Sequence, residues 1–162
     1  DVYKRQPGLT ASSAYDLLID YINEAGAPGA DIIDGSGTLN LGRVMERNVS
    51  GITDAAVASY YYESSGDAQD RAQVVVENRG TTALHNLTVE IGSGNNEQTY
   101  NISFVPPGEI AVVETSVGLP SLSQELGVKV STEVRVNENL NQSDRNPQDN
   151  ILNTVISDEL AP

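Results

Sequence analysis

The chain has 162 residues, and its 23 acidic side chains against nine basic ones give a formal net charge of −14. This excess of negative charge excludes nucleic acid as a partner, because phosphate binding requires clustered Lys and Arg. It also disfavours anionic membrane surfaces. The sequence contains no cysteine, which excludes disulfides, zinc thiolate sites and cysteine nucleophiles. No apolar run is long enough for a transmembrane helix, so we expect no membrane insertion.

Two structural units are predicted, because the periodicity of apolar residues changes along the chain. Residues 1–6 fit neither pattern and resemble translated adapter sequence, so we expect them to be non-native. Residues 7–55 are predicted to be helical and glycine-punctuated, and residues 56–158 to be strands and turns. Residues 159–162 are a tail. Hydrophobic residues make up 38% of the chain, enough for a modest core and too many for a disordered chain.

The first predicted helix spans residues 10–24, where apolar side chains recur at the spacing of one buried helical face. Ser12 or Ser13 is expected to cap its start by accepting an orphan amide hydrogen. Gly26 is expected to end it by adopting a positive φ, and Pro28 to prevent its resumption.

A second short helix is predicted from Asn40, its cap, to about residue 47, with Leu41, Val44 and Met45 as its apolar stripe. Two short helices cannot bury both stripes against each other. We therefore expect a missing partner, as in a truncated α/β domain.

The stretch 29–45 resembles the end of a subtilisin-like (S8 family) serine peptidase domain, which closes with a helix and a glycine turn into a last short helix. The matching positions are Gly35, Gly37, Leu39 and Asn40. The resemblance covers roughly residues 8–48 and implies a serine endopeptidase as the parent chain. The Asp, His and Ser of such an enzyme would lie upstream, in a catalytic core that is the expected partner of this fragment. Accordingly, we predict no catalytic residue and no cofactor here.

From residue 57 the pattern alternates with period two, which predicts antiparallel strands with one face in a core. The expected strands are residues 57–62, 72–77, 87–91, 100–104, 110–113, 128–136 and 151–156. Seven short strands separated by turns predict an immunoglobulin-like β-sandwich without the cysteine pair of antibody domains. The fold class expected for the chain is therefore mainly β, with two short helices before the sandwich.

Four pieces of this half resemble the bacterial cell-adhesion-related (CARDB-type) domain, over roughly residues 56–158. They are Val76 to Thr81, Asn86 to Val89, Pro107-Gly108-Glu109 and Asp144 to Asn150. The resemblance implies a fold and little about function, because such domains serve as spacers, adhesins and accessory modules.

Oxygen-bearing side chains occur close together at two places. Asp144, Asn146, Asp149 and Asn150 carry ligands of the kind that Ca²⁺ takes, but Asx side chains bonded to a turn backbone explain them better. Asp31 and Asp34 are likewise interpreted as loop residues. We therefore predict no metal site.

Two further features are given structural roles. His85 has no nucleophile near it in sequence and is interpreted as a lone surface histidine in a loop. Tyr60, Tyr61 and Tyr62 would alternate between the faces of a strand. Tyr61 and its outward neighbours are interpreted as packing between the sandwich and the first half, rather than as a carbohydrate platform.

The function predicted is that of a non-catalytic C-terminal portion of a secreted or cell-surface subtilisin-like peptidase. The sandwich would serve stability, spacing, or contact with a protein substrate or a surface. Two alternatives remain open, an adhesion or ligand-binding module and a structural spacer. The binding-module alternative is distinguished from the peptidase fragment by whether the two helices bury their apolar faces within this chain.

Overall fold

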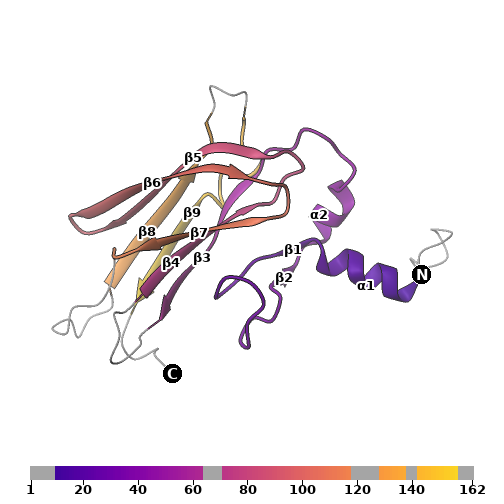
Figure 1. Cartoon of the computed structure of the whole chain (residues 1–162), viewed down its shortest axis with the longest axis horizontal. Coiled ribbons are helices and arrows are strands. Elements are labelled where there is room, and N and C mark those ends of the chain that lie inside the picture. The colour runs from indigo at the N-terminus through magenta and orange to yellow at the C-terminus, as the bar shows by residue number, and fades with distance from the viewer. Residues whose placement is uncertain (1–9, 64–70, 118–127, 138–141, 157–162) are drawn as a thin grey trace.

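Two β-sheets facing each other form the body of the molecule, and a smaller helical part extends from one end (Figure 1). The computed structural model describes residues 10–63, 71–117, 128–137 and 142–156. In this part of the chain seven strands build the sandwich, as the alternating pattern predicts. The fold is mainly β, with antiparallel pairing within both sheets.

One sheet has three strands and the other has four. The three-stranded sheet has the order β3-β4-β7 and consists of β3 (Ala55–Glu63), β4 (Arg71–Asn78) and β7 (Ile110–Thr115). The four-stranded sheet has the order β6-β5-β8-β9 and consists of β5 (Leu84–Ser93), β6 (Asn96–Val105), β8 (Val128–Arg135) and β9 (Ile151–Ile156).

All seven strands contribute to the core between the sheets, and the edge strands β6 and β9 each add only their last residue and one or two partly buried side chains. Its buried members include Val74, Val76, Leu87, Val89, Ile91, Val113, Val130 and Val134. Branched aliphatic side chains suit this position because they pack well on a pleated surface.

The inward face of β5 changes phase at Asn86. This residue has φ of 52°, in the left-handed region that Asn tolerates better than most residues. Leu84 before it and Leu87 after it are therefore both buried, although they are three residues apart. His85 lies in β5 and not in a loop, and its exposed ring contacts Phe104 at 5.1 Å between centroids.

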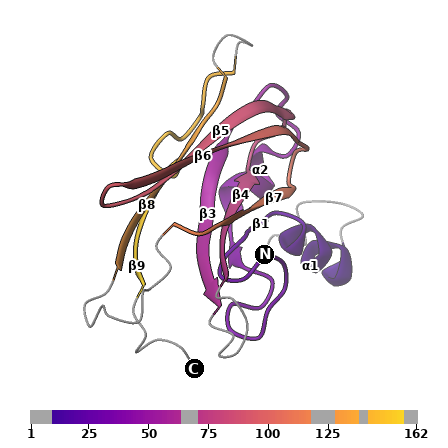
Figure 2. The same cartoon turned by 60° about the vertical axis from the view of Figure 1, so that its left-hand side comes forward.

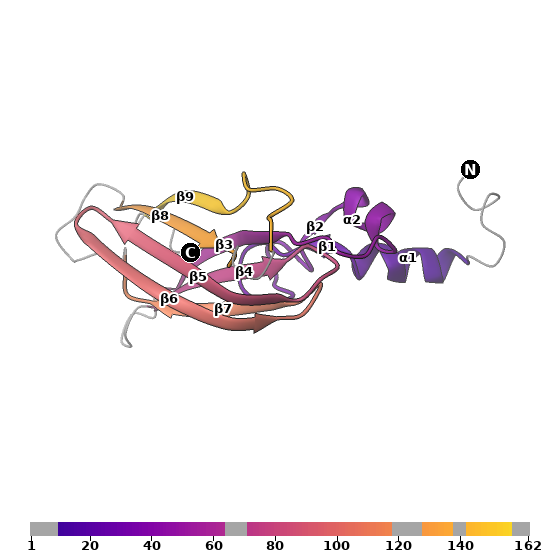
Figure 3. The same cartoon turned by 90° about the horizontal axis from the view of Figure 1, so that it is seen from above.

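The first half of the described chain, residues 10–51, contains α1 (Ala11–Ile19), β1 (Ile22–Asn23), β2 (Thr38–Leu39) and α2 (Leu41–Glu46). The strands β1 and β2 pair antiparallel. Seen from above, the molecule is elongated, with the sandwich at one end and α1 at the other (Figure 3).

The first helix is shorter than predicted. It is capped by Thr10, whose side chain accepts from the Ser13 amide in a reciprocal capping box, and not by Ser12 or Ser13. It ends at Ile19, because the chain turns there to place Ile22 and Asn23 in β1. The role given to Gly26 as its terminator was therefore wrong.

The second helix agrees with its prediction. Asn40 caps it by accepting from the Arg43 amide, and Arg47 is its C-terminal cap. Its stripe is not buried as a whole, since Val44 is buried while Leu41 and Met45 are 59% and 78% exposed.

The first half packs on the outer face of the three-stranded sheet, the face turned away from the other sheet (Figure 2). The Ser59 hydroxyl on β3 donates to the Gly26 carbonyl at 2.6 Å. Val75, which neighbours core residues on both sides, is fully buried on this outer face. The strand β4 is thus covered on both faces.

Candidate functional site

A buried carboxylate lies where the first half meets the sandwich. Glu77, near the end of β4, is 2% exposed. It pairs with Arg43 from α2 and accepts from Arg79 Nε at 3.0 Å and from the Glu24 amide at 3.1 Å. A buried charge is tolerated only when it is paired and hydrogen-bonded. We call Glu77, Arg43 and Arg79 the junction ion pairs.

Arg43 is held by the first half and extends into the sheet. Its backbone amide is fixed by the Asn40 cap, and its guanidinium also donates to the Ile22 carbonyl and to Asn23 Oδ1. This one side chain therefore links α2, β1 and β4. The glycine turn keeps β1 in place: Gly37 has φ of 111°, and a Cβ there would lie 2.2 Å from the Asn23 carbonyl oxygen.

Three further carboxylates lie beside the junction ion pairs. Asp54, Asp144 and Asp149 each place one oxygen within 4.8 Å of the others, and we call them the acidic cluster. Asp54 precedes β3, and the other two belong to the turn before β9. Asp149 Oδ2 pairs with Arg79 at 2.9 Å, so Arg79 bridges the cluster to Glu77.

The Asp144 carboxylate accepts hydrogen bonds from backbone amides. Its Oδ1 accepts from the Asn146 amide and its Oδ2 from the Ala55 amide, both at 2.9 Å. The first contact is the local turn bond predicted for this segment. The second crosses to the start of β3 and was not predicted.

The electrostatics of the cluster follow from burial and crowding of like charges. Burial raises the pKa of Asp54 to about 6, helped by the charges of Asp149 and Asp144 and opposed by Arg79 and Arg43. Burial also raises the pKa of Asp149, against the attraction of Arg79. Like charges close together disfavour ionisation of both.

The acidic cluster supplies few ligands for a metal ion. Ca²⁺ takes six to eight oxygens, whereas the three carboxylates offer one converging oxygen each. A guanidinium already neutralises Asp149. We therefore do not assign the cluster as a metal centre.

The other predicted acidic pair organises a loop. Asp31 Oδ1 accepts from the amides of Ile33 and Asp34, each at 2.7 Å, and Oδ2 accepts from the Ala27 amide. These backbone bonds lower the pKa of Asp31. The loop also requires Gly26, since a Cβ there would lie 2.3 Å from Asp34 Oδ2.

The tyrosines of β3 divide between the two faces. Tyr60 and Tyr62 pack against the core from its margin, and the Tyr60 hydroxyl donates to the Val117 carbonyl. Burial raises the pKa of Tyr60 to about 12. The contact to the first half from this strand is made by Ser59.

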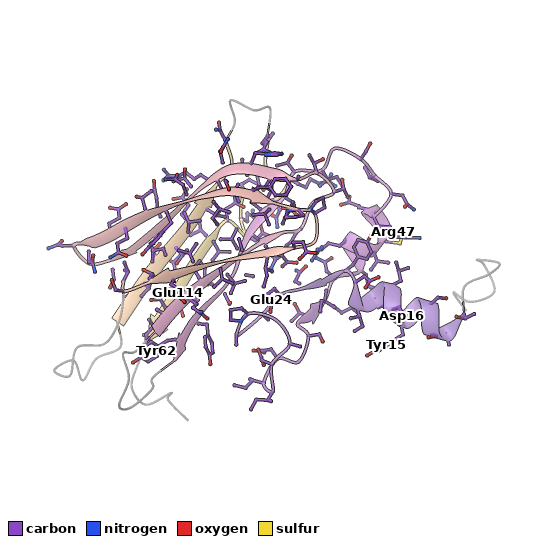
Figure 4. All side chains as sticks on the ribbon, in the orientation of Figure 1. Tyr15, Asp16, Glu24, Arg47, Tyr62 and Glu114 are labelled. Carbon is purple, nitrogen blue, oxygen red and sulfur yellow. The ribbon has the colours of Figure 1, made fainter. Side chains whose placement is uncertain are left out.

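An apolar surface is exposed on the first half. Apart from Ile32 and Ile33 in the loop of Asp31, which are also exposed, its members are Tyr15, Ile19, Leu39, Leu41, Met45 and Val49, of which Tyr15 and Met45 are 65% and 78% exposed. No residue of α1 is buried, and Figure 4 shows Tyr15 and Asp16 on this helix at a distance from both sheets. We call these six residues the exposed apolar surface.

Sequence reasoning missed Asp54 and the junction ion pairs. These residues lie up to 36 positions apart, from Arg43 to Arg79, and share no local motif. One signal was present: Val74-Val75-Val76 is a continuous apolar run, which is typical of a strand buried on both faces. A Glu directly after such a run needs a buried partner.

The class defined by these features is a two-sheet antiparallel β domain with a helical part fixed to the outer face of one sheet. The chain matches no protein-family model and no curated protein. Among solved structures it is similar to a domain, residues 272–376, of a protein from Methanosarcina acetivorans described as a "putative cell surface protein". The TM-score is 0.49 at 13% identity, with 66% of this chain and 92% of that chain covered. Both values are too low to assign a family or a function. No helix of the described residues is long and apolar enough to cross a membrane.

Proposed function

We propose that the chain is the non-catalytic C-terminal portion of a secreted subtilisin-like serine endopeptidase, whose β-sandwich stabilises the end of the catalytic domain. The observation that carries this proposal is the contrast between the two sides of the first half. The side of the first half that faces the sandwich is held by buried ion pairs. Away from the sandwich, Tyr15, Leu41 and Met45 of the first half are largely exposed. Exposed apolar residues gathered on one part of a molecule mark an interaction site.

The order of elements supports a peptidase parent. The subtilisin-like ending consists of a helix, a glycine turn and a last short helix, and α1, Gly35, Gly37 and the Asn40-capped α2 follow in that order. The missing upstream core would then cover the exposed apolar surface.

The second resemblance is supported by where its pieces lie. Val76 to Thr81 ends β4, and Pro107-Gly108-Glu109 forms the turn before β7, with φ of 77° at Gly108. Residues 144–150 form the turn before β9. An accessory CARDB-type domain fits this arrangement.

Stabilisation fits the junction better than flexible spacing does. Arg43 and Glu77 have side chains only 7% and 3% exposed, and ordered contacts of this kind hold two units in one orientation. A flexible spacer would instead connect its units through a polar linker with few contacts.

The test is to recover the coding sequence upstream of residue 7, express the extended chain and label it with a fluorophosphonate probe of serine nucleophiles. We expect labelling that is lost when the upstream serine is replaced by Ala. Deleting residues 56–162 should lower the thermal stability of the labelled enzyme.

An upstream sequence without an Asp, His and Ser set would overturn the peptidase parentage. Upstream sandwiches that repeat the Asn-Arg-Gly and Pro-Gly signatures would favour the spacer alternative. If deletion of residues 56–162 leaves the thermal stability of the labelled enzyme unchanged, the peptidase parentage would stand and the stabilising role of the sandwich would be contradicted.

A further inference from the structure

We propose that β9 is the site at which two copies of this chain associate, through antiparallel pairing of the outer edge of β9 in one copy with the same edge in the other. The proposal concerns the four-stranded sheet and does not depend on a peptidase parent.

The outer edge of β9 is defined by its pairing with β8. Among the described strands β9 pairs only with β8, and Figure 3 shows it at the outer side of that strand. The Asn150 carbonyl, just before β9, accepts from the Val134 amide of β8 at 2.9 Å, which continues the same register. Because neighbouring residues of a strand direct their N–H and C=O groups to opposite sides, Ile151, Asn153 and Val155 direct theirs away from β8.

These edge groups are unpaired in the part of the chain that the structure describes. The nearest bond on this side runs from the Val57 amide to the Asp149 carbonyl, so the start of β3 closes the edge only as far as the turn before β9. From Ile151 onward no hydrogen bond from the described residues reaches the outer backbone groups. A row of unpaired N–H and C=O groups is a template for a further strand.

The strand β9 lacks the features that usually protect a sheet edge. Its sequence, Ile-Leu-Asn-Thr-Val-Ile, contains no charged residue, proline or glycine. Among the other edge strands, β6 carries Glu97, β7 carries Glu114, and β3 has a bulge between Val57 and Ser59. Natural proteins block free edges with charges and bulges. A regular, uncharged edge therefore points to a strand that is meant to be paired.

The edge is complementary to itself about a two-fold axis through Asn153. Antiparallel pairing centred there sets Asn153 opposite Asn153 of the second copy, and Ile151 opposite Val155 of the second copy. Ile151 and Val155 are 49% and 53% exposed, and Asn153 is also exposed. The pairing would cover two apolar contacts and join two side-chain amides, and such cross-strand pairs stabilise sheets. A two-fold contact of this kind closes as a dimer.

The charges beside the edge are arranged for a second copy. Lys129 of β8 lies opposite Val155, and Glu133 lies opposite Ile151. The two-fold axis therefore sets Lys129 of one copy in the same row of the joined sheet as Glu133 of the other. The net charge of −14 opposes association at longer range, and salt screens charges that are exposed and far apart. Because a single short strand makes a small contact, we expect a weak dimer that added salt strengthens.

The first experiment is sedimentation equilibrium of the full chain from micromolar to millimolar concentration, at low and at high NaCl. We expect a monomer–dimer equilibrium that shifts toward the dimer with salt. Asn153→Lys removes no bond to β8 and sets two like charges together at the axis, so it should weaken the dimer by about tenfold or more. Asn101→Lys, at an exposed residue of the other edge strand β6, is the matched control and should leave the dissociation constant unchanged.

The second experiment uses the absence of cysteine from the sequence. In Asn153→Cys the two single thiols would meet at the axis, with Cα atoms about 5.5 Å apart as in a hydrogen-bonded antiparallel pair. A disulfide spans that distance. We expect air oxidation to give a covalent dimer of Asn153→Cys, and no such dimer of Asn101→Cys.

Four results would overturn the proposal. The first is a monomer at the highest concentration at both salt levels. The second is a dimer that Asn153→Lys leaves unchanged or that Asn101→Lys weakens equally. The third is equal cross-linking of Asn153→Cys and Asn101→Cys, since random collision would then explain the covalent dimer. The fourth is a dimer that is lost in Met45→Ser and kept in Asn153→Lys, since the exposed apolar surface would then be the contact.

Discussion

The sandwich and the first half are ordered by different kinds of contact. The sandwich is held by apolar burial, with Leu84, Leu87, Val89 and Ile91 of a single strand all fully buried. The first half has no buried residue in α1 and depends on caps, a glycine turn and the junction ion pairs. Hydrophobic burial is the dominant favourable term in folding. Because α1 buries no apolar residue, we expect the first half to be stabilised mainly where it is attached to the sandwich.

The largest effect is expected from Glu77→Ala, which removes the carboxylate that joins the two regions. Arg43 and Arg79 would remain partly buried without it, so we expect a loss of about 3–5 kcal/mol in the free energy of unfolding. Denaturant unfolding measures this. The control is Glu114→Ala, at an exposed residue on β7 of the same sheet, which should cost less than about 0.5 kcal/mol. Equal costs for the two variants would mean that the junction contributes no stability.

The next largest contrast is between leucines of the two regions. Leu87→Ala empties a fully buried core site and should cost about 2–5 kcal/mol. Leu41→Ala, at a residue 59% exposed, should cost less than about 0.5 kcal/mol. Both are measured as shifts of the denaturant midpoint. A large cost for Leu41→Ala would show that another part of the chain covers the exposed apolar surface.

A smaller effect is expected at the glycine turn. Gly37→Ala imposes a side chain at φ of 111° and 2.2 Å from the Asn23 carbonyl oxygen, which we expect to cost about 1–3 kcal/mol. The loss should appear as faster amide exchange in β1 and α2, with the sandwich unaffected. Gly92→Ala is the control, since a Cβ there meets its nearest atom only at 4.0 Å. Faster exchange throughout the sandwich would contradict this account, and so would unchanged exchange in β1.

The smallest effect concerns the start of α1. Thr10→Ala removes the capping box with Ser13 and should destabilise the helix by about 1 kcal/mol. Far-UV circular dichroism should record a small loss of helix, while the unfolding midpoint of the sandwich stays the same. Asp16→Asn retains the cap and serves as control. If the sandwich midpoint falls with Thr10→Ala, α1 is coupled to the core more closely than its exposure indicates.

The seven strands could be predicted because alternation and turn residues are local signals, and sheets with one buried face repeat them in every strand. The change of phase at Asn86 could not, because it depends on one residue adopting a positive φ. The end of α1 was placed too late, because apolar spacing continued through Ile22 while pairing with Leu39 placed that residue in β1. Tertiary pairing overrode the helical pattern there.

The candidate site was predicted only in part. Asp144 and Asp149 were noticed because they lie close in sequence, and the local turn bond from the Asn146 amide agrees with their interpretation. Asp54 could not be added to them, because it is distant in sequence and only the tertiary structure brings its segment beside the turn before β9. Arg43 gave no sequence signal, because an arginine in a short helix is ordinarily solvated.

The most direct test of the contrast between the two regions is amide hydrogen exchange on the full chain. We predict slow exchange across Val74, Val75 and Val76, intermediate exchange at the Glu24 amide bonded to Glu77, and fast exchange along α1. This gradient would show that the first half is ordered from its attachment point and lacks a covering partner. Protection of α1 as strong as that of β4 would contradict the account, because the helix would then belong to the same cooperative unit as the sandwich.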